Sequence, residues 1–121
     1  MKVLYTTGDL YKQTGITERS IRYYSNLDLL NTIKNNRGQL VLVQSDLVNL
    51  VQILVSKILG YRLKELKGST FQMNDLGIEL HQKIADLENI LIHLDNQEND
   101  ETLLNTLYLL HRFNIKYLPQ R

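Results

Sequence analysis

The stretch Thr17-Glu18-Arg19-Ser20-Ile21-Arg22-Tyr23-Tyr24 decides the fold of this chain. Its pattern predicts a helix capped by the Thr17 hydroxyl, preceded by a shorter helix over residues 8–13 that Thr6 caps. A break at residues 14–16, Thr-Gly-Ile, separates the two helices. Two helices joined by a tight turn that contains glycine predict a helix-turn-helix, whose second helix can enter a major groove.

The second helix of this pair is expected to have one apolar face and one cationic face. Arg19 and Arg22 lie three residues apart and therefore share a face. Tyr23 lies beside them and has a hydroxyl that can reach a phosphate, whereas Ile21 and Tyr24 are expected to be buried. This face indicates a DNA-contacting surface, although motifs this short also occur by chance on ordinary helices.

A small β-hairpin is expected after the second helix. Asn35-Asn36-Arg37-Gly38 is a cluster of turn-forming residues, and it lies between residues 32–34 and the apolar run 40–43. A hairpin directly after a helix-turn-helix is a wing.

The next segment predicts a third helix over residues 46–59. Ser45 is expected to cap it, and Gly60 is suited to end it. Residues 62–67 then predict one or two further helical turns, and Gly-Ser-Thr at 68–70 is expected to close the first domain.

Beyond residue 75 the apolar residues follow a heptad spacing. The positions that define it are Leu80, Ile84, Leu87, Leu91 and Leu94. This narrow stripe favours a coiled-coil seam between two copies of the chain, and the alternative is one amphipathic helix packed on its own domain. A last helix over residues 101–117 must pack on the coiled coil or on a partner subunit, because so short a segment does not fold alone.

The sequence predicts a cytoplasmic protein without a membrane span or signal peptide. It has no cysteine, which fits a reducing compartment and excludes disulfides and thiolate metal sites. Residues 1–70 hold ten Lys or Arg against five acidic residues, a net charge of +5, whereas residues 71–121 hold four against eight, a net of −4. A basic first half and an acidic second half predict that only the first faces a polyanion.

Several ordered motifs in the chain are similar to those of one family. They are Tyr5-Thr6-Thr7-Gly8-Asp9-Leu10, Thr14-Gly15-Ile16-Thr17, Arg19-Ser20-Ile21-Arg22-Tyr23-Tyr24, Leu29-Leu30, Ser45-Asp46-Leu47 and Leu59-Gly60-Tyr61-Arg62-Leu63-Lys64-Glu65-Leu66. With these motifs the chain resembles the MerR-type transcriptional regulators over about residues 4–67.

The resemblance implies a mainly α-helical protein. Its winged helix-turn-helix domain would span residues 1–70, and residues 71–121 would form a dimerisation coiled coil and a short C-terminal helix. It also implies a homodimer that binds a palindromic promoter element in double-stranded DNA and bends and untwists the spacer, so that RNA polymerase contacts come into register.

The resemblance further implies which residues contact DNA. From the recognition helix these are Thr17, Arg19, Arg22 and Tyr23, with Arg19 expected at or near a base edge and Arg22 and Tyr23 at phosphates.

The wing departs from the family pattern. Leu40 stands where that pattern has arginine, and Leu42 stands where it has tyrosine. Lys34 and Arg37 are the remaining cations nearby, so we expect weaker binding with a flatter salt dependence. The apolar strand also suggests that the wing touches another protein.

The sequence also bears on ligand binding, on catalysis and on other functions of a helix-turn-helix protein. No cofactor or metal is expected, since His81, His93 and His111 are not spaced as helical ligand pairs, and a small ligand would sit where the last helix meets the coiled coil, near Tyr108, His111 and Phe113. No enzyme is expected, because no nucleophile-and-base constellation or phosphate-binding loop is present. The alternative functions are a helix-turn-helix protein-interaction module with weakened DNA binding and an excisionase-like architectural factor.

Overall fold

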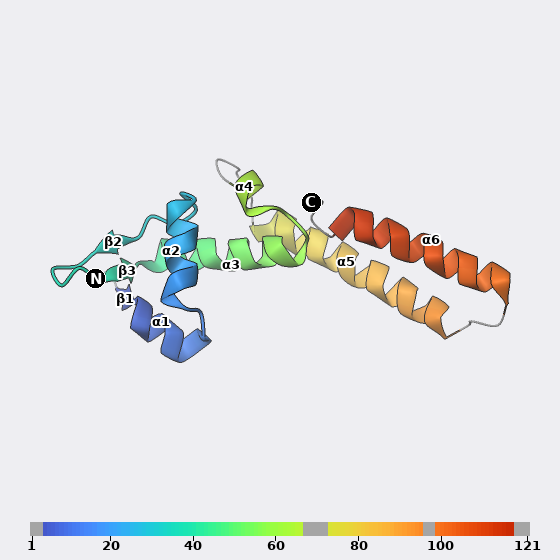
Figure 1. Cartoon of the computed structure of the whole chain (residues 1–121), viewed down its shortest axis with the longest axis horizontal. Helices are drawn as coiled ribbons and strands as arrows, with labels where there is room; N and C mark the ends of the chain where they lie inside the picture. Colours follow the sequence, from blue (N-terminus) through green and yellow to red (C-terminus); the bar gives the residue numbers. More distant parts are fainter. Residues whose placement is uncertain (1–3, 67–72, 96–98, 118–121) are drawn as a thin grey trace. The chain divides into compact units, whose positions relative to one another are not determined.

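The computed structural model describes residues 4–66, 73–95 and 99–117 of the 121-residue chain. Within them the chain forms two compact units, whose elements are labelled in Figure 1. The first unit comprises residues 4–54 and 63–66, and the second comprises residues 55–62, 73–95 and 99–117. The fold is mainly helical with a small antiparallel sheet, as predicted.

The first unit is a winged helix-turn-helix. Its elements are β1 (Tyr5–Thr6), α1 (Thr7–Thr14), α2 (Glu18–Asn26), β2 (Ile33–Lys34), β3 (Leu40–Leu42), the first part of α3 (Gln44–Ile58) and α4 (Leu63–Leu66). The predicted hairpin is confirmed as β2 and β3, and β1 adds a third strand that the sequence did not reveal. The predicted turns after residue 60 are confirmed as α4, whereas the expected closure at residues 68–70 lies outside the described residues.

The ends of α1 and α2 follow from side-chain caps. The Thr6 hydroxyl accepts from the Asp9 backbone N–H at 3.1 Å, and the Asp9 carboxylate accepts from the Thr6 N–H at 3.2 Å. This backbone hydrogen bond lowers the pKa of Asp9. Gly15 ends α1 with a φ of 78°, and the Thr17 hydroxyl caps α2 by accepting from Ser20. Both predicted caps are confirmed, so the turn between the helices is fixed locally.

Strand β3 lies in the centre of the sheet, whose order is β1-β3-β2. Tyr5 pairs with Leu42 on one side, and Lys34 pairs with Leu40 on the other. All three residues of β3 are buried. The suggestion that this apolar strand touches another protein is therefore wrong, because its side chains fill the core of their own unit.

The start of α3 differs from expectation. The helix begins at Gln44, so Ser45 lies inside it and is not its cap. The buried carboxylate of Asp46 instead accepts from the backbone N–H groups of Val43 at 3.0 Å and Asn31 at 3.1 Å. One side chain thus satisfies two backbone donors, and the one at Val43 lies directly before α3.

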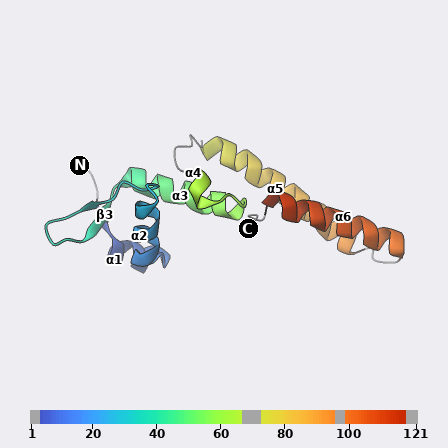
Figure 2. The ribbon, with the colours of Figure 1, turned by 45° about the horizontal axis from the view of Figure 1, so that its top comes forward.

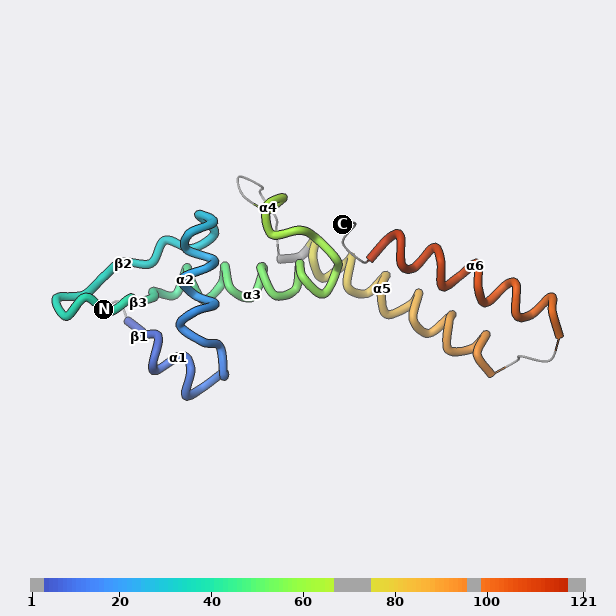
Figure 3. Tube along the Cα trace, viewed as in Figure 1, coloured from blue at the N-terminus to red at the C-terminus, as the bar shows by residue number. Residues whose placement is uncertain are grey.

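The second unit is a helical hairpin packed against the end of α3. Helices α5 (Met73–Leu94) and α6 (Asp100–Tyr117) run antiparallel, and they lie side by side in Figures 1 and 2 and along the trace in Figure 3. The last helix therefore packs on α5 of its own chain, one of the two arrangements expected for it.

Three buried residues form the core of this unit: Leu59, Leu76 and Tyr117. Gly60 follows Leu59 with a φ of 89° and ends α3, as predicted. A side chain at Gly60 would overlap the backbone carbonyl of Tyr117, so the end of α6 lies directly on this turn. Among the residues described, none of the helices is both long and apolar enough to span a lipid bilayer.

Candidate DNA-binding surface

The exposed face of α2 brings together three of the predicted contact residues. Arg19, Arg22 and Tyr23 are all exposed, and at about 100° per residue they fall within about 100° of the helix circumference. Ile21 and Tyr24 are buried on the other side, as predicted. The helix therefore presents two guanidinium groups and a phenol hydroxyl to solvent.

Arg22 has an intramolecular partner that the sequence analysis missed. Its guanidinium donates to the Glu18 carboxylate at 2.9 Å, and both side chains are about half exposed. The signal was present in the sequence, since residues four apart on a helix are neighbours. An exposed pair of this kind is worth only a few tenths of a kcal/mol, so a phosphate can displace the carboxylate.

Thr17 has a structural role. Its hydroxyl caps α2 by accepting from the Ser20 N–H at 3.2 Å, and it also donates to the Ser20 hydroxyl at 3.1 Å. It is nevertheless exposed, and it lies at the helix N-terminus, where backbone N–H groups and the helix dipole favour an anion.

The remaining two predicted contacts lie on the wing. Lys34 is the exposed end of β2, and Arg37 is exposed in the turn that follows. The Asn35 side chain holds this turn by accepting from the backbone of Arg37 at 2.9 Å and of Gln39 at 3.0 Å, and Gly38 takes a φ of 75°. The six predicted residues therefore lie on α2 and its N-cap and on the wing, both in the first unit.

A second surface runs along α5. Four of the five heptad residues are exposed in the single chain, to the extent of 46% for Ile84, 48% for Leu87, 61% for Leu91 and 51% for Leu94. The fifth, Leu80, packs on the core of its own unit. Two residues of α5 are buried within the single chain: Leu76, which packs with Tyr117 of α6, and Ile90, which lies about 60° around the helix from Leu87.

Two polar contacts hold the C-terminal end of α6 against α5. The Asp86 carboxylate accepts from the Tyr117 hydroxyl at 2.5 Å and from the Lys116 ammonium at 3.1 Å. The hydrogen bond from Tyr117 is the main reason that the pKa of Asp86 is lowered, and burial is the main reason that the pKa of Tyr117 is raised.

These features define a class of protein. A helix-turn-helix with an exposed cationic second helix, a hairpin wing in a three-stranded sheet and a following helical hairpin is a winged helix-turn-helix protein.

The comparisons with known proteins name the family. The sequence signature of the MerR HTH family regulatory proteins matches residues 5–70, so the chain belongs to the MerR family, whose members are DNA-binding transcription regulators. The HTH-type transcriptional regulator YfmP of Bacillus subtilis (strain 168) is 31% identical over 94 residues, which cover 76% of this chain and 62% of that protein. The chain thus spans less than two thirds of the length of that relative.

A solved structure agrees with the fold. A transcriptional regulator of the MerR family from Bacillus cereus has a TM-score of 0.50 and 20% sequence identity, over 94% of this chain and 99% of that one. At this identity the likeness concerns the fold alone, and it extends beyond the helix-turn-helix into the helical hairpin.

Proposed function

We propose that the chain is a sequence-specific DNA-binding transcriptional regulator in which residues 1–70 bind DNA and residues 71–121 supply the dimerisation and C-terminal helices. The observation that supports this most directly is the α2 face, where Arg19, Arg22 and Tyr23 are exposed together. The second helix of a helix-turn-helix is the one that enters the major groove, and here it has the cationic surface which that position requires.

The contact residues have separate roles in this proposal. Arg19 contacts a base edge, because it lies in the first turn of α2, and residues near the start of a recognition helix contact bases. Arg22 and Tyr23 contact phosphates and set the position of the helix on the duplex. Lys34 and Arg37 place the wing against the backbone of the flanking DNA.

We propose further that the regulator is a homodimer. The exposed stripe on α5, defined by Ile84, Leu87, Leu91 and Leu94, is apolar and has the two-per-seven spacing of a coiled-coil seam. A second α5 in antiparallel orientation would cover it. A two-fold dimer presents two α2 helices, which suits a palindromic DNA element.

On this basis the dimer acts at a promoter by bending and untwisting the spacer, so that RNA polymerase makes its contacts in register. Membership of the family supports this step. Bending and untwisting the spacer costs a free energy that depends on the spacer sequence, and the additional protein–DNA contacts that the deformed DNA permits offset this cost.

DNA binding is tested by a mobility-shift titration on the DNA upstream of the chain's own gene. We expect a retarded band at moderate salt that is lost when Arg19→Ala and Arg22→Ala are combined. Lys57→Ala, which removes an exposed cation of α3 outside both α2 and the wing, is the matched control and should leave the band intact. A wild-type chain that shifts no fragment would overturn the proposal.

The dimer is tested by sedimentation equilibrium. Leu87→Asp places a charge on the proposed seam and should convert the dimer to a monomer. Ile78→Asp is the matched control, because Ile78 is also an exposed apolar residue of α5 but lies about 160° around the helix from Leu80 and so off the stripe. A dimer that survives Leu87→Asp, or a monomeric wild-type chain, would contradict the seam.

A further inference from the structure

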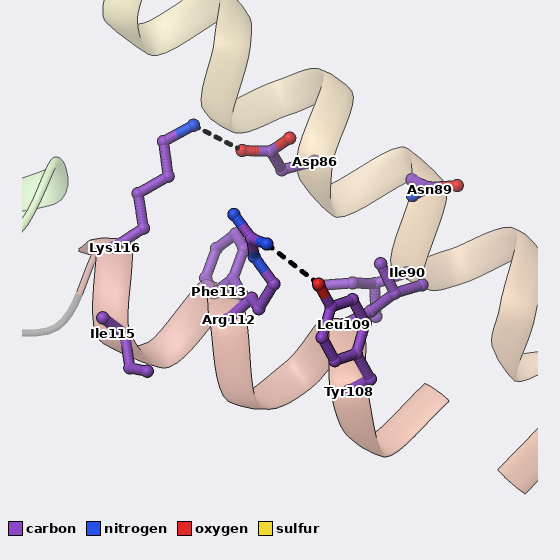
Figure 4. A pocket seen from close by; sticks show the side chains of 9 residues that line it. All are labelled: Asp86, Asn89, Ile90, Tyr108, Leu109, Arg112, Phe113, Ile115 and Lys116. Atoms are coloured by element: carbon purple, nitrogen blue, oxygen red, sulfur yellow. Dashed lines mark hydrogen bonds and ion pairs between the residues drawn. The ribbon is translucent and has the colours of Figure 1, made fainter. Parts of the chain in front are cut away.

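A groove runs between α5 and α6 within the second unit, and Figure 4 shows the side chains around it. It has a volume of about 680 Å³. Pockets that hold small organic ligands have volumes of about 300–1,000 Å³. The groove therefore has room for a compact organic molecule.

The floor of the groove is apolar. Ile90 of α5 is buried, and Leu109 and Phe113 of α6 are half-buried beside it. The aromatic ring of Tyr108, which is largely exposed, forms one wall. Such a lining favours the planar or branched apolar body of a ligand, because burying that body removes apolar surface from water.

The rim of the groove has an excess positive charge. Lys116 is paired with Asp86 at 3.1 Å, so these two charges offset each other. Arg112 instead donates to the Tyr108 hydroxyl at 2.9 Å, and its guanidinium lies 5.6 Å from the centre of the Tyr108 ring. Within the described residues it forms no ion pair with a carboxylate. The hydrogen bond that Arg112 donates to Tyr108 raises the pKa of Arg112. An arginine side chain is cationic at any physiological pH.

We propose that this groove binds a small amphipathic organic anion, a carboxylate joined to an aromatic body. A guanidinium presents parallel N–H donors that match a carboxylate, and it binds such a group more strongly than a neutral acceptor. Arg112 would hold the carboxylate, with Lys116 close by to add a second donor. The Tyr108 ring and the apolar floor would contact the aromatic body.

The proposed ligand and the proposed dimer use different faces of α5. Asn89 borders the groove and lies about 160° around the helix from Leu91 of the exposed stripe. Ile90, on the floor, lies about 60° from Leu87, so a partner helix on the stripe would border the groove on that side and leave the Asn89 side open. The ligand site also stands independently of DNA binding, since every residue that forms it belongs to the second unit.

The test is isothermal titration calorimetry of the full chain with naphthalene-2-carboxylate, and with naphthalene-2-carboxamide as its neutral counterpart. We expect the carboxylate to bind at millimolar or lower concentration and the amide to bind about tenfold more weakly, since only the first forms charge-assisted hydrogen bonds. Equal affinity of the two compounds, or no heat from the carboxylate, would overturn the proposal.

Variants and a spectroscopic measurement locate the site. Arg112→Met should weaken carboxylate binding about tenfold while leaving amide binding unchanged. Arg62→Met, which removes another exposed arginine of the second unit, is the matched control. In the wild-type chain, methyl NMR signals of Ile90 and Leu109 should shift on addition of the carboxylate. Shifts confined to other methyl groups would refute this site without any variant having to fold.

Discussion

Replacing Arg19 by alanine should reduce affinity for a specific DNA element far more than affinity for random DNA. Arg19 is exposed in the first turn of α2, and within the described residues it forms no ion pair, so its removal leaves the fold intact. One arginine contact to a base edge contributes about 1–3 kcal/mol of discrimination. A homodimer loses two such contacts, or about 2–6 kcal/mol, which corresponds to a loss of at least about 25-fold in affinity.

Fluorescence anisotropy with labelled duplexes measures this directly. The wild-type chain and the Arg19→Ala variant are titrated against the selected element and against a shuffled duplex at one fixed salt concentration. Circular dichroism melting curves of the two proteins should coincide, because surface substitutions of this kind change stability by no more than about 0.5 kcal/mol. An equal loss on both duplexes would show that Arg19 contacts phosphate, and no loss on either would refute the use of α2 as the recognition helix.

Three further predictions concern charge and packing. Glu18→Gln frees Arg22 and removes a negative charge that faces phosphate, so anisotropy should show tighter binding to any duplex, whereas weaker binding would contradict the assigned role of Arg22. The hydrogen bond from Tyr117 lowers the pKa of Asp86 below its ordinary value of 3.8, so its stabilisation is present above that pH and is lost as the pH falls through the lowered value. The melting temperature should therefore drop in strong acid, and Asp86→Asn should make that drop smaller; an unchanged acid dependence would rule out this contribution. Gly60→Ala should lower the melting temperature by several degrees, because the new methyl group meets the Tyr117 carbonyl and the backbone there has a positive φ, and a neutral effect would mean that the two helix ends separate easily.

The sequence was most informative where structure is local. Thr6 and Thr17 each cap a helix with a side chain three residues from its partner, and Gly60 ends α3 at the predicted place. Signals of this kind need only a few neighbouring residues, so they can be recognised in a single chain. The exposed face of α2 followed from the same short-range periodicity.

Features that depend on distant partners could not be predicted in this way. Strand β1 has two residues, and it exists because Tyr5 pairs with Leu42, far along the chain. Leu40 and Leu42 suggest a wing that touches another protein when only the local sequence is considered. Their burial on the central strand depends on strands β1 and β2 and on the core, which the local sequence does not reveal. The local pattern favours Ser45 as the cap of α3. The hydrogen bond from the Asn31 backbone to Asp46 joins residues far apart in the sequence, so the local pattern does not predict it.

Helix α5 has one face that the local sequence predicts and one that depends on a distant helix. Its heptad pattern indicates the stripe that contains Leu87 and Leu91, whereas the packing of Leu76 and Ile90 inside the same chain depends on α6, which lies far along the sequence. The groove bordered by Arg112 depends on that second face. A ligand position between the last two helices was anticipated at Tyr108, His111 and Phe113, and the groove includes the first and the third of these.

We propose that the exposed α2 face of a two-fold dimer recognises a specific DNA element. Genome-wide selection of DNA fragments with the purified chain, followed by sequencing, tests this recognition. We expect enrichment of one palindromic element by the wild-type chain and loss of that enrichment in the Arg19→Ala variant, with Lys57→Ala behaving as wild type. Recovery of fragments without a shared element would contradict it.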